Sequence, residues 1–261
     1  MVGRELKDFF PTRNVNLGST RVKVRNLSSG NGVKDISFDI RKGEIVGMAG
    51  LVGAGRTQVA QALFGVDRKT SGVVELDGRS LEINSPTDAI ANHIAFLTED
   101  RKRTGLCLEL PCSWNVTLPN LVAIGMKNVI KPGRENKIVA NIAKRISIKW
   151  LGPQAPVDSL SGGNQQKILI ARWLLAESKF MIFDEPTRGI DVGAKKEVYS
   201  LLEKLADQGK AILFISSELP ELFGIADRIL VMRRGRLVGN VNPKEITQEE
   251  VMHLAAVEAT Q

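Results

Sequence analysis

The residues best suited to chemistry form a glycine-rich stretch, GLVGAGRTQ, which runs from Gly50 to Gln58. Glycines at this spacing leave a bare backbone, so several N–H groups can converge on a polyphosphate at the positive end of a helix. An apolar run precedes the stretch and a helical pattern follows it, which predicts a strand, a loop and a helix in that order. We therefore predict a phosphate-binding loop (P-loop), with an ordinary glycine-rich turn as the alternative. The predicted nucleotide contacts are Gly50, Gly53, Ala54, Gly55, Arg56, Thr57 and Gln58.

Two side chains of this loop have distinct expected roles. Thr57 is placed to ligate Mg²⁺ beside a bound nucleotide. Arg56 stands where a loop of this kind has a lysine. Its guanidinium keeps the positive charge but is a wide planar fork, whereas an ammonium is a compact point charge that fits between the β- and γ-phosphates. We therefore expect nucleotide binding to survive this change and hydrolysis to be impaired.

Two carboxylates follow a run of four apolar residues at 180–183. Such a run is typical of a buried central strand, and ligands of open α/β sheets bind at the carboxyl ends of the strands. Asp184 therefore suits Mg²⁺ binding, and Glu185 is placed to polarise an attacking water. A solvated turn is the alternative interpretation.

A third candidate is the start of a predicted helix at Ser161. Serine is a common N-cap residue, and the two glycines that follow it leave the first-turn N–H groups open to an anion. A helix cap without any ligand is the alternative.

Composition narrows the function classes without choosing one. The net charge of +7 and the pI of about 9.5 suit nucleic acid, an anionic membrane surface or a nucleotide, but an aromatic content of 5% is poor for base stacking. No window approaches a membrane span and the first residues lack the apolar centre of a signal peptide, so we expect a soluble, cytosolic chain. Two cysteines support neither a disulfide framework nor a zinc site.

The hydrophobic pattern predicts elements that would position these residues. Alternation predicts antiparallel strands early in the chain, and an Asp77-Gly78 turn indicates a hairpin. A four-residue spacing of isoleucines predicts a helix within a mainly helical region, and Thr247 begins a capping-box pattern. The predicted strands cover 21–25, 36–40, 93–97, 211–215 and 228–232, the hairpin 72–83, and the helices 86–92, 134–146 and 192–207.

Several of these motifs together resemble a known family. The glycine loop, LSGGNQQK from Leu160 and FDEPTRGID from Phe183 are similar, in identity and order, to the ATPase domains of ABC transporters. With TEDRK from Thr98 and SSELPE from Ser216, the chain resembles the second ATPase half of bacterial monosaccharide importers of the ribose, galactose and xylose type.

The resemblance covers nearly the whole chain and implies its fold and domain organisation. The fold would be α/β, a P-loop NTPase of ABC type with a mixed central sheet, an antiparallel β lobe and an inserted helical lobe at about 100–176. Residues 1–20 would be a linker from a preceding ATPase half, and residues 21–261 the ABC ATPase domain.

The resemblance also implies roles for individual residues. Two ATPase halves of this family pair head to tail, so the signature residues would contact a nucleotide held by the partner, and Asp191 would lie at the interface. Glu99 stands where the family has a glutamine near the metal, and Ser217 where it has a histidine. The expected metal ligands are Thr57, Glu99 and Asp184, the catalytic residues Glu185 and Ser217, and the signature residues Ser161, Gly162, Gly163 and Asn164.

The resulting prediction is an ATP-binding domain of a sugar importer, which binds ATP and Mg²⁺ and couples hydrolysis to transport. We expect a degenerate half that lends its signature loop to its partner, on the inner face of the cell membrane. Its partners would be the N-terminal ATPase half, the permease subunits and, indirectly, an extracytoplasmic sugar-binding protein, with no nucleic acid. The alternative is an ABC-type ATPase acting on nucleic acid or the ribosome, which only the basic charge supports.

Overall fold

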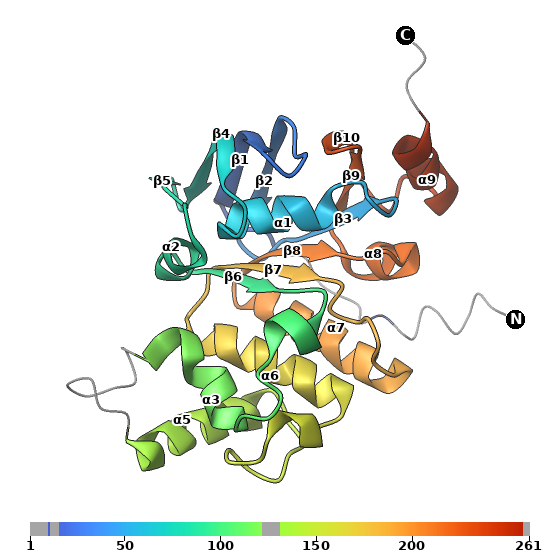
Figure 1. Cartoon of the computed structure of the whole chain (residues 1–261). Coiled ribbons are helices and arrows are strands. Elements are labelled where there is room, and N and C mark those ends of the chain that lie inside the picture. The colour runs from blue at the N-terminus through green and yellow to red at the C-terminus, as the bar shows by residue number, and fades with distance from the viewer. Residues whose placement is uncertain (1–9, 11–15, 122–130, 258–261) are drawn as a thin grey trace, which may run out of the picture. The chain divides into compact units, whose positions relative to one another are not determined.

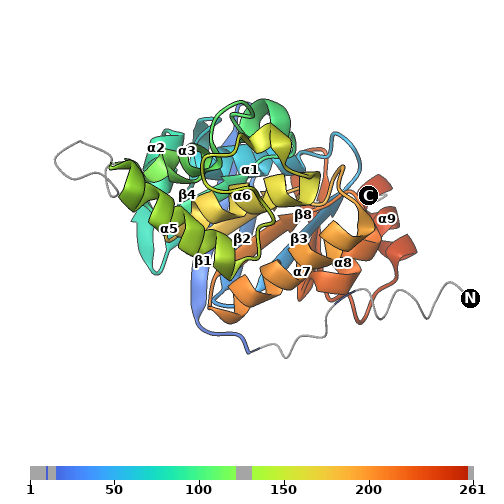
Figure 2. The same ribbon diagram turned by 90° about the horizontal axis from the view of Figure 1, so that it is seen from below.

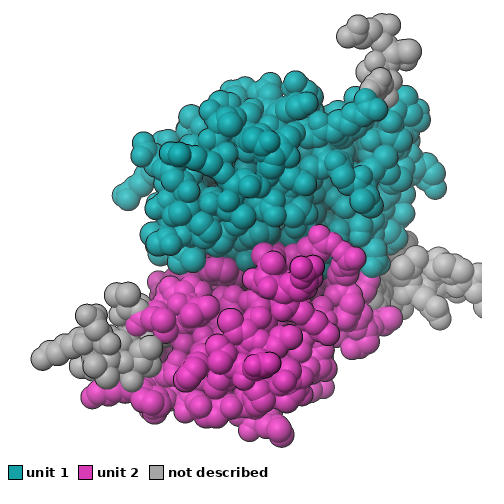
Figure 3. All heavy atoms as spheres, viewed as in Figure 1, with its two compact units in different colours: residues 1–96, 179–185, 202–261 teal, residues 97–178, 186–201 magenta. Residues whose placement is uncertain are grey.

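The computed structural model describes residue 10, residues 16–121 and residues 131–257. The chain divides into two compact units (Figures 1 and 3). The first contains residues 1–96, 179–185 and 202–261, and the second contains residues 97–178 and 186–201. Most of the segment predicted as a linker, residues 1–20, lies outside the described residues.

The first unit contains a four-stranded antiparallel sheet with the order β2-β1-β4-β5. Its alternation of buried and exposed residues gives one apolar face, as the sequence pattern predicts. Asp77 and Gly78 both have positive φ, which confirms the predicted hairpin turn between β4 and β5. The strands are β1 (Thr20–Ser29), β2 (Ile36–Arg41), β4 (Lys69–Leu76) and β5 (Arg79–Leu81).

The other sheet of this unit has six strands in the order β10-β9-β3-β8-β7-β6. Strand β3 runs parallel to both β8 and β9, β7 is parallel to β8, and β10 is antiparallel to β9, so the sheet is mixed as expected. Every residue of β7 and β8 is buried, which explains their unbroken apolar sequences. The strands are β3 (Ile45–Gly50), β6 (Ile94–Leu97), β7 (Phe180–Asp184), β8 (Ala211–Ile215), β9 (Arg228–Arg233) and β10 (Arg236–Val241).

Among the described residues, four whole helices belong to the first unit. Helix α9 begins with the capping box predicted at Thr247, whose hydroxyl accepts a hydrogen bond from the Glu250 amide at 3.2 Å. The sequence analysis missed α8, which packs against β3. The helices are α1 (Arg56–Phe64), α2 (Pro86–Ala91), α8 (Leu219–Ile225) and α9 (Gln248–Ala256).

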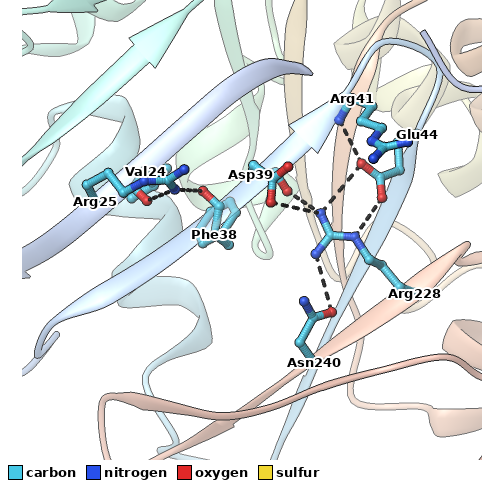
Figure 4. A network of polar contacts seen from close by, with 8 residues as sticks. All are labelled: Val24, Arg25, Phe38, Asp39, Arg41, Glu44, Arg228 and Asn240. Carbon is cyan, nitrogen blue, oxygen red and sulfur yellow. Dashed lines mark hydrogen bonds and ion pairs between the residues drawn. The ribbon is translucent and has the colours of Figure 1, made fainter. Parts of the chain in front are cut away.

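A buried ion pair ties strand β2 to β9 and β10 inside the first unit (Figure 4). The Arg228 Nε donates to Glu44 Oε1 at 2.6 Å, and the other Glu44 oxygen accepts from the Arg41 amide at 2.6 Å. Arg228 also donates to the Asp39 carbonyl and, at 3.3 Å, to Asn240 Oδ1. Since the Glu44 side chain is only 4% exposed, its charge depends on these donors.

The second unit is largely helical. Helices α3 (Cys112–Thr117), α5 (Pro132–Arg145) and α6 (Gly162–Leu175) pack against one another, and α5 lies beside α6 in both views (Figures 1 and 2). The α5 helix matches the one predicted from isoleucine spacing, with Ile142 on its buried face. Helix α7 (Val192–Asp207) has the predicted bounds, and its first ten residues belong to this unit.

Replacing Arg228 with alanine should lower the free energy of unfolding by about 3–5 kcal/mol, because it leaves the Glu44 carboxylate buried without its cation. Urea denaturation of the purified chain measures this difference. The matched control is Arg236→Ala on the exposed side of β10, which should change the free energy of unfolding by about 0.5 kcal/mol or less. Equal effects of the two substitutions would contradict the importance of the buried pair.

Candidate functional site

The predicted phosphate loop joins β3 to α1, as the sequence pattern requires. Gly53 and Gly55 have φ values of 80° and 102°, which a residue with a Cβ rarely adopts. A Cβ at Gly53 would meet no atom within 4 Å, so the loop presents open backbone there. Gly50 is needed for a different reason, because a Cβ would lie 2.7 Å from the Met232 carbonyl oxygen.

Helix α1 begins at Arg56, three residues earlier than the helical pattern indicated, and Gly55 is its N-cap residue. Arg56, Thr57 and Gln58 therefore all belong to the first turn of the helix, whose N–H groups have no partner within the helix. No acidic side chain occupies this turn. The positive end of the helix dipole is thus available to an anion at the loop.

Asp184 lies at the end of β7 and is buried, with an exposed fraction of 1%. Burial raises the pKa of Asp184 to about 6, while the neighbouring Thr57 hydroxyl and the Arg56 charge act in the opposite direction. Neither carboxylate oxygen has a hydrogen-bond partner of normal geometry among the described residues. A buried, unsatisfied carboxylate beside a hydroxyl is the oxygen donor set that Mg²⁺ prefers, so Thr57 and Asp184 fit the predicted metal role.

Glu185 follows directly and has a left-handed backbone, with φ of 47°. The Ser217 hydroxyl donates to Glu185 Oε2 at 3.1 Å, so the structure brings the two predicted catalytic residues together. Arg56 lies on the other side of the same carboxylate, with Nη2 3.6 Å from Oε1. Its Nη1 donates to the Ser216 carbonyl at 2.8 Å. Arg56 is therefore directed at Glu185 and the Ser216–Ser217 segment in this structure.

The signature residues Ser161, Gly162, Gly163 and Asn164 lie at the start of α6 in the second unit. Ser161 occupies the N-cap position, but its side chain caps no backbone N–H, contrary to the expectation for a serine there. The reason is that its hydroxyl accepts from Asn164 Nδ2 at 2.9 Å. Asn164 is held in turn because its Oδ1 accepts from the Lys149 amide at 2.8 Å. The exposed Ser161 and the glycine backbone remain at the positive end of a 14-residue helix.

Sequence reasoning missed Arg101, which connects the loops of the second unit. Its guanidinium donates to the carbonyls of Arg188 and Gly189 at 2.8 and 3.2 Å, and to Gln165 Oε1 of α6 at 3.3 Å. A Cβ at Gly162 would lie 2.8 Å from Arg101 Nη2. Arg101 belongs to the TEDRK stretch that begins at Thr98, but its partners lie 64 to 88 residues further along the chain.

Two further predicted residues also lie in the second unit. Glu99 forms an ion pair with Arg188, so its carboxylate has a partner other than a metal in this structure. Asp191 accepts from the Ala194 amide at 3.0 Å and so caps the first turn of α7. The described residues contain no cluster of three or more acidic, histidine or cysteine side chains arranged for a metal. Any cation at Thr57 and Asp184 would take its remaining ligands from the nucleotide and water.

Comparison with known proteins decides the family. The model of the family described as ABC transporter matches residues 33–188, which include the phosphate loop, the signature and the Asp184-Glu185 pair. The chain belongs to the ABC transporter family. The ABC ATPase domain expected from the motifs is therefore confirmed at the level of family.

The relatives of this ABC domain include curated import proteins. The chain is 46% identical over 255 residues to the ribose import ATP-binding protein RbsA of Bacillus subtilis, covering 98% of this chain and 52% of that protein. It is 48% identical over 256 residues to RbsA of Clostridium perfringens, with coverages of 98% and 51%. A putative ribose/galactose/methyl galactoside import ATP-binding protein of Rhizobium meliloti is 45% identical over 256 residues, with the same coverages. The chain spans about half the length of the curated relatives it matches.

Solved structures confirm the fold. A nucleotide-free ATP-binding cassette from an ABC transporter superposes with a TM-score of 0.78 at 16% identity, covering 92% of this chain and 100% of that one. A cassette in a dimeric post-hydrolysis state bound to ADP and phosphate gives a TM-score of 0.70 at 22% identity, with coverages of 85% and 98%. Among the described residues, no helix is long and apolar enough to cross a membrane.

Asp184→Asn should stabilise the nucleotide-free chain and weaken its binding of Mg-ATP. The pKa of Asp184 is raised above its ordinary value of 3.8 to about 6, so the folded state loses stability as pH rises through this window and the carboxylate ionises. At pH 8 the variant should unfold with a free energy about 3 kcal/mol higher than the wild type, and near pH 4 the two should converge. Denaturation at both pH values measures this, and a destabilised variant at pH 8 would contradict it.

Proposed function

We propose that this chain is the ATP-binding domain of a sugar importer and the C-terminal of two ATPase halves on one polypeptide. In this proposal it binds Mg-ATP, hydrolyses it weakly, and completes its partner's site with its signature loop. The observation that carries the proposal is the contrast between the two sites. The signature loop keeps Ser161, which is exposed, and both glycines, although Asn164 stands where the family usually has a glutamine. In the phosphate site, by contrast, Arg56 and Ser217 depart from the family pattern.

The division into halves rests on length and similarity. The match to ribose import proteins covers 98% of this chain but only about half of each relative, which leaves room for a second domain of equal size. Residues 1–20 would then be the linker between halves and residues 21–261 the ABC domain. The family's head-to-tail pairing would place Ser161–Asn164 against a nucleotide held by the N-terminal half, and Asp191 near the interface.

The ATP site of this chain has the groups needed for binding. The backbone of Gly50–Gly55 and the first turn of α1 would hold the phosphates, and Thr57 and Asp184 would hold Mg²⁺, which neutralises phosphate charge when bound. Glu185 would accept a proton from the attacking water. A positioned catalytic group contributes about 10²- to 10⁴-fold, so altering the P-loop cation and losing the histidine can reduce turnover of about 1–100 s⁻¹ to near zero. Glu99 would approach the metal only after releasing Arg188.

A groove in the second unit supports docking of the permease subunits. It has a volume of about 350 Å³, and its wall includes Trp114, Leu118 and Leu121. Trp114 is 52% exposed and Leu118 is 53% exposed, although both residues are large and apolar. Beneath them Glu135 is buried and accepts from the Thr117 hydroxyl at 2.6 Å, which fixes the wall. An apolar groove with a firm base suits a short helix of a membrane subunit.

Through those permease subunits the chain would lie on the inner face of the cell membrane. An extracytoplasmic sugar-binding protein would be an indirect partner. The alternative of an ATPase acting on nucleic acid or the ribosome is not favoured, because the similar curated proteins are named as import proteins. Sugar import by this chain is inferred from those names.

In an intact importer, Ser161→Arg should abolish turnover, because an arginine side chain at the start of α6 would occupy the space of the partner's nucleotide.

The isolated wild-type chain should bind Mg-ATP and show little hydrolysis that depends on Glu185. Steady-state phosphate release beside a Glu185→Gln variant measures the latter. In the intact importer, loss of turnover in Arg56→Ala but not in Ser161→Arg would contradict the proposal, because it would make this chain's phosphate loop essential and its signature loop dispensable.

Trp114→Ser should weaken association with the permease subunits by about tenfold or more, because a large aromatic anchor would be lost from the groove. Binding to detergent-solubilised permease measures this affinity. Met252→Ser on α9 is the matched control, since Met252 is also a large apolar residue and is 41% exposed. An equal effect of the two substitutions would contradict docking at this groove.

A further inference from the structure

The side chain of Arg56 is enclosed within the first unit. Its side chain is only 11% exposed, and that of Glu185 is 9% exposed. One terminal nitrogen of the guanidinium donates to the Ser216 carbonyl at 2.8 Å, and the other lies 3.6 Å from Glu185 Oε1. The Arg56 guanidinium thus links the end of β7 to the segment that follows β8. It does so through two terminal nitrogens, Nη1 and Nη2, whereas a lysine has only one.

Glu185 is held from both sides by these contacts. Arg56 approaches Oε1, and the Ser217 hydroxyl donates to Oε2 at 3.1 Å. The Glu185 amide also donates to the Ile215 carbonyl at 3.0 Å, while its backbone stays in the left-handed region. Each oxygen that could accept a proton from water therefore already faces a donor or a cation supplied by this chain.

We propose that Arg56 is a positioning residue that silences Glu185, and that it acts on this carboxylate and the Ser216 carbonyl while nucleotide is bound. This inference rests on the proposed function, because it assumes that the chain binds ATP at the phosphate loop. In this inference the loop amides, Thr57 and Asp184 hold the nucleotide. Arg56 prevents Glu185 from accepting a proton from the attacking water. ATP is thereby retained without being consumed.

The chemical consequence follows from the hydrolysis step. The water oxygen bonds to the γ-phosphorus, the bond from that phosphorus to the β–γ bridging oxygen breaks, and ADP and phosphate form. Glu185 would take the proton that the water loses. The contacts with Arg56 and Ser217 fix the orientation of this carboxylate and engage both of its oxygens, so neither oxygen is free to accept a proton from an attacking water. This arrangement slows the step without removing any group that binds ATP.

The pairing of Arg56 with Glu185 also explains how the γ-phosphate of a nucleotide can be bound beside the Glu185 carboxylate. A free carboxylate near the γ-phosphate would repel it, and this repulsion is strong where water is excluded. With Arg56 in place, the pair carries no net charge. A lysine offers one point charge and cannot contact both the Ser216 carbonyl and Glu185 through separate planar nitrogens. Arg56→Lys should therefore free Glu185 at least part of the time.

The deciding experiment compares wild type, Arg56→Lys, Glu185→Gln and the double variant of the 261-residue chain. Affinity is measured with a fluorescent ATP analogue in Mg²⁺, and kcat and KM by phosphate release. Arg56→Lys should raise kcat about tenfold or more, with KM within about threefold, because a freed general base acts on the chemical step. The double variant should lose this gain.

Arg21→Lys is the matched control. Arg21 also pairs with a carboxylate, with Nε 3.2 Å from Asp77 Oδ1, and donates to the Gly209 carbonyl at 2.8 Å. It belongs to the same unit and has a similarly covered side chain, but it contacts none of the proposed ATP-site residues. Its replacement should leave kcat unchanged. A general effect of losing a buried arginine would appear equally in this control.

Should Arg56→Lys fail to fold, Arg56→Gln decides, because it keeps a donor for the Ser216 carbonyl and removes the charge from Glu185. Turnover at or below the wild-type level in a variant that still binds Mg-ATP overturns the inference. A gain that survives Glu185→Gln overturns it as well. If the wild-type chain does not bind Mg-ATP, the proposed function fails together with this inference, whereas binding without any gain removes this inference alone.

Discussion

The parallel registers of β3, β8 and β7 bring the chemistry of the first unit to one edge of a sheet. Met48 lies opposite Ile215, and Ile215 lies opposite Asp184, so β7 and β8 end together while β3 continues for two further residues to Gly50. The next residues of each strand are the phosphate loop, the Ser216–Ser217 segment and Glu185. Backbone hydrogen bonds fix this alignment, and slipping any strand by one residue would turn its buried side chains to the opposite face. The site depends on that register more than on any single side chain.

Burial at this edge gives the site its electrostatic character. The sheet encloses Asp184 without hydrogen-bond partners of normal geometry, which raises its pKa, and it encloses Glu185 beside a guanidinium. The Arg56 charge only partly offsets the burial of the first carboxylate, Asp184, so a bound cation would relieve an unfavourable state. The second carboxylate, Glu185, already lies beside the Arg56 guanidinium, so it interacts less with a bound nucleotide. Adjacent acidic residues can thus serve opposite purposes because their surroundings differ.

Much of this arrangement could be predicted from the sequence, because it depends on local patterns. The apolar run before Asp184, the Asp77-Gly78 turn and the capping box at Thr247 each belong to one short segment, and all were confirmed. Helix α8 and strand β10 were missed because α8 has seven residues, with a proline near its start, and β10 is a half-buried edge strand. The directions of Arg56 and Arg101 could not be predicted, since their partners lie far along the chain, 160 residues away for Ser216.

The contact between the first turns of α6 and α7 has an evolutionary consequence. A Cβ at Gly163 would lie 2.6 Å from that of Ala194, so the two positions have room for a single methyl group between them. An inherited change of Gly163 to alanine would therefore be tolerated best in a lineage that had already exchanged Ala194 for glycine. A selection for suppressors should recover such compensation at the start of α7, and homologous sequences should show the two positions changing together.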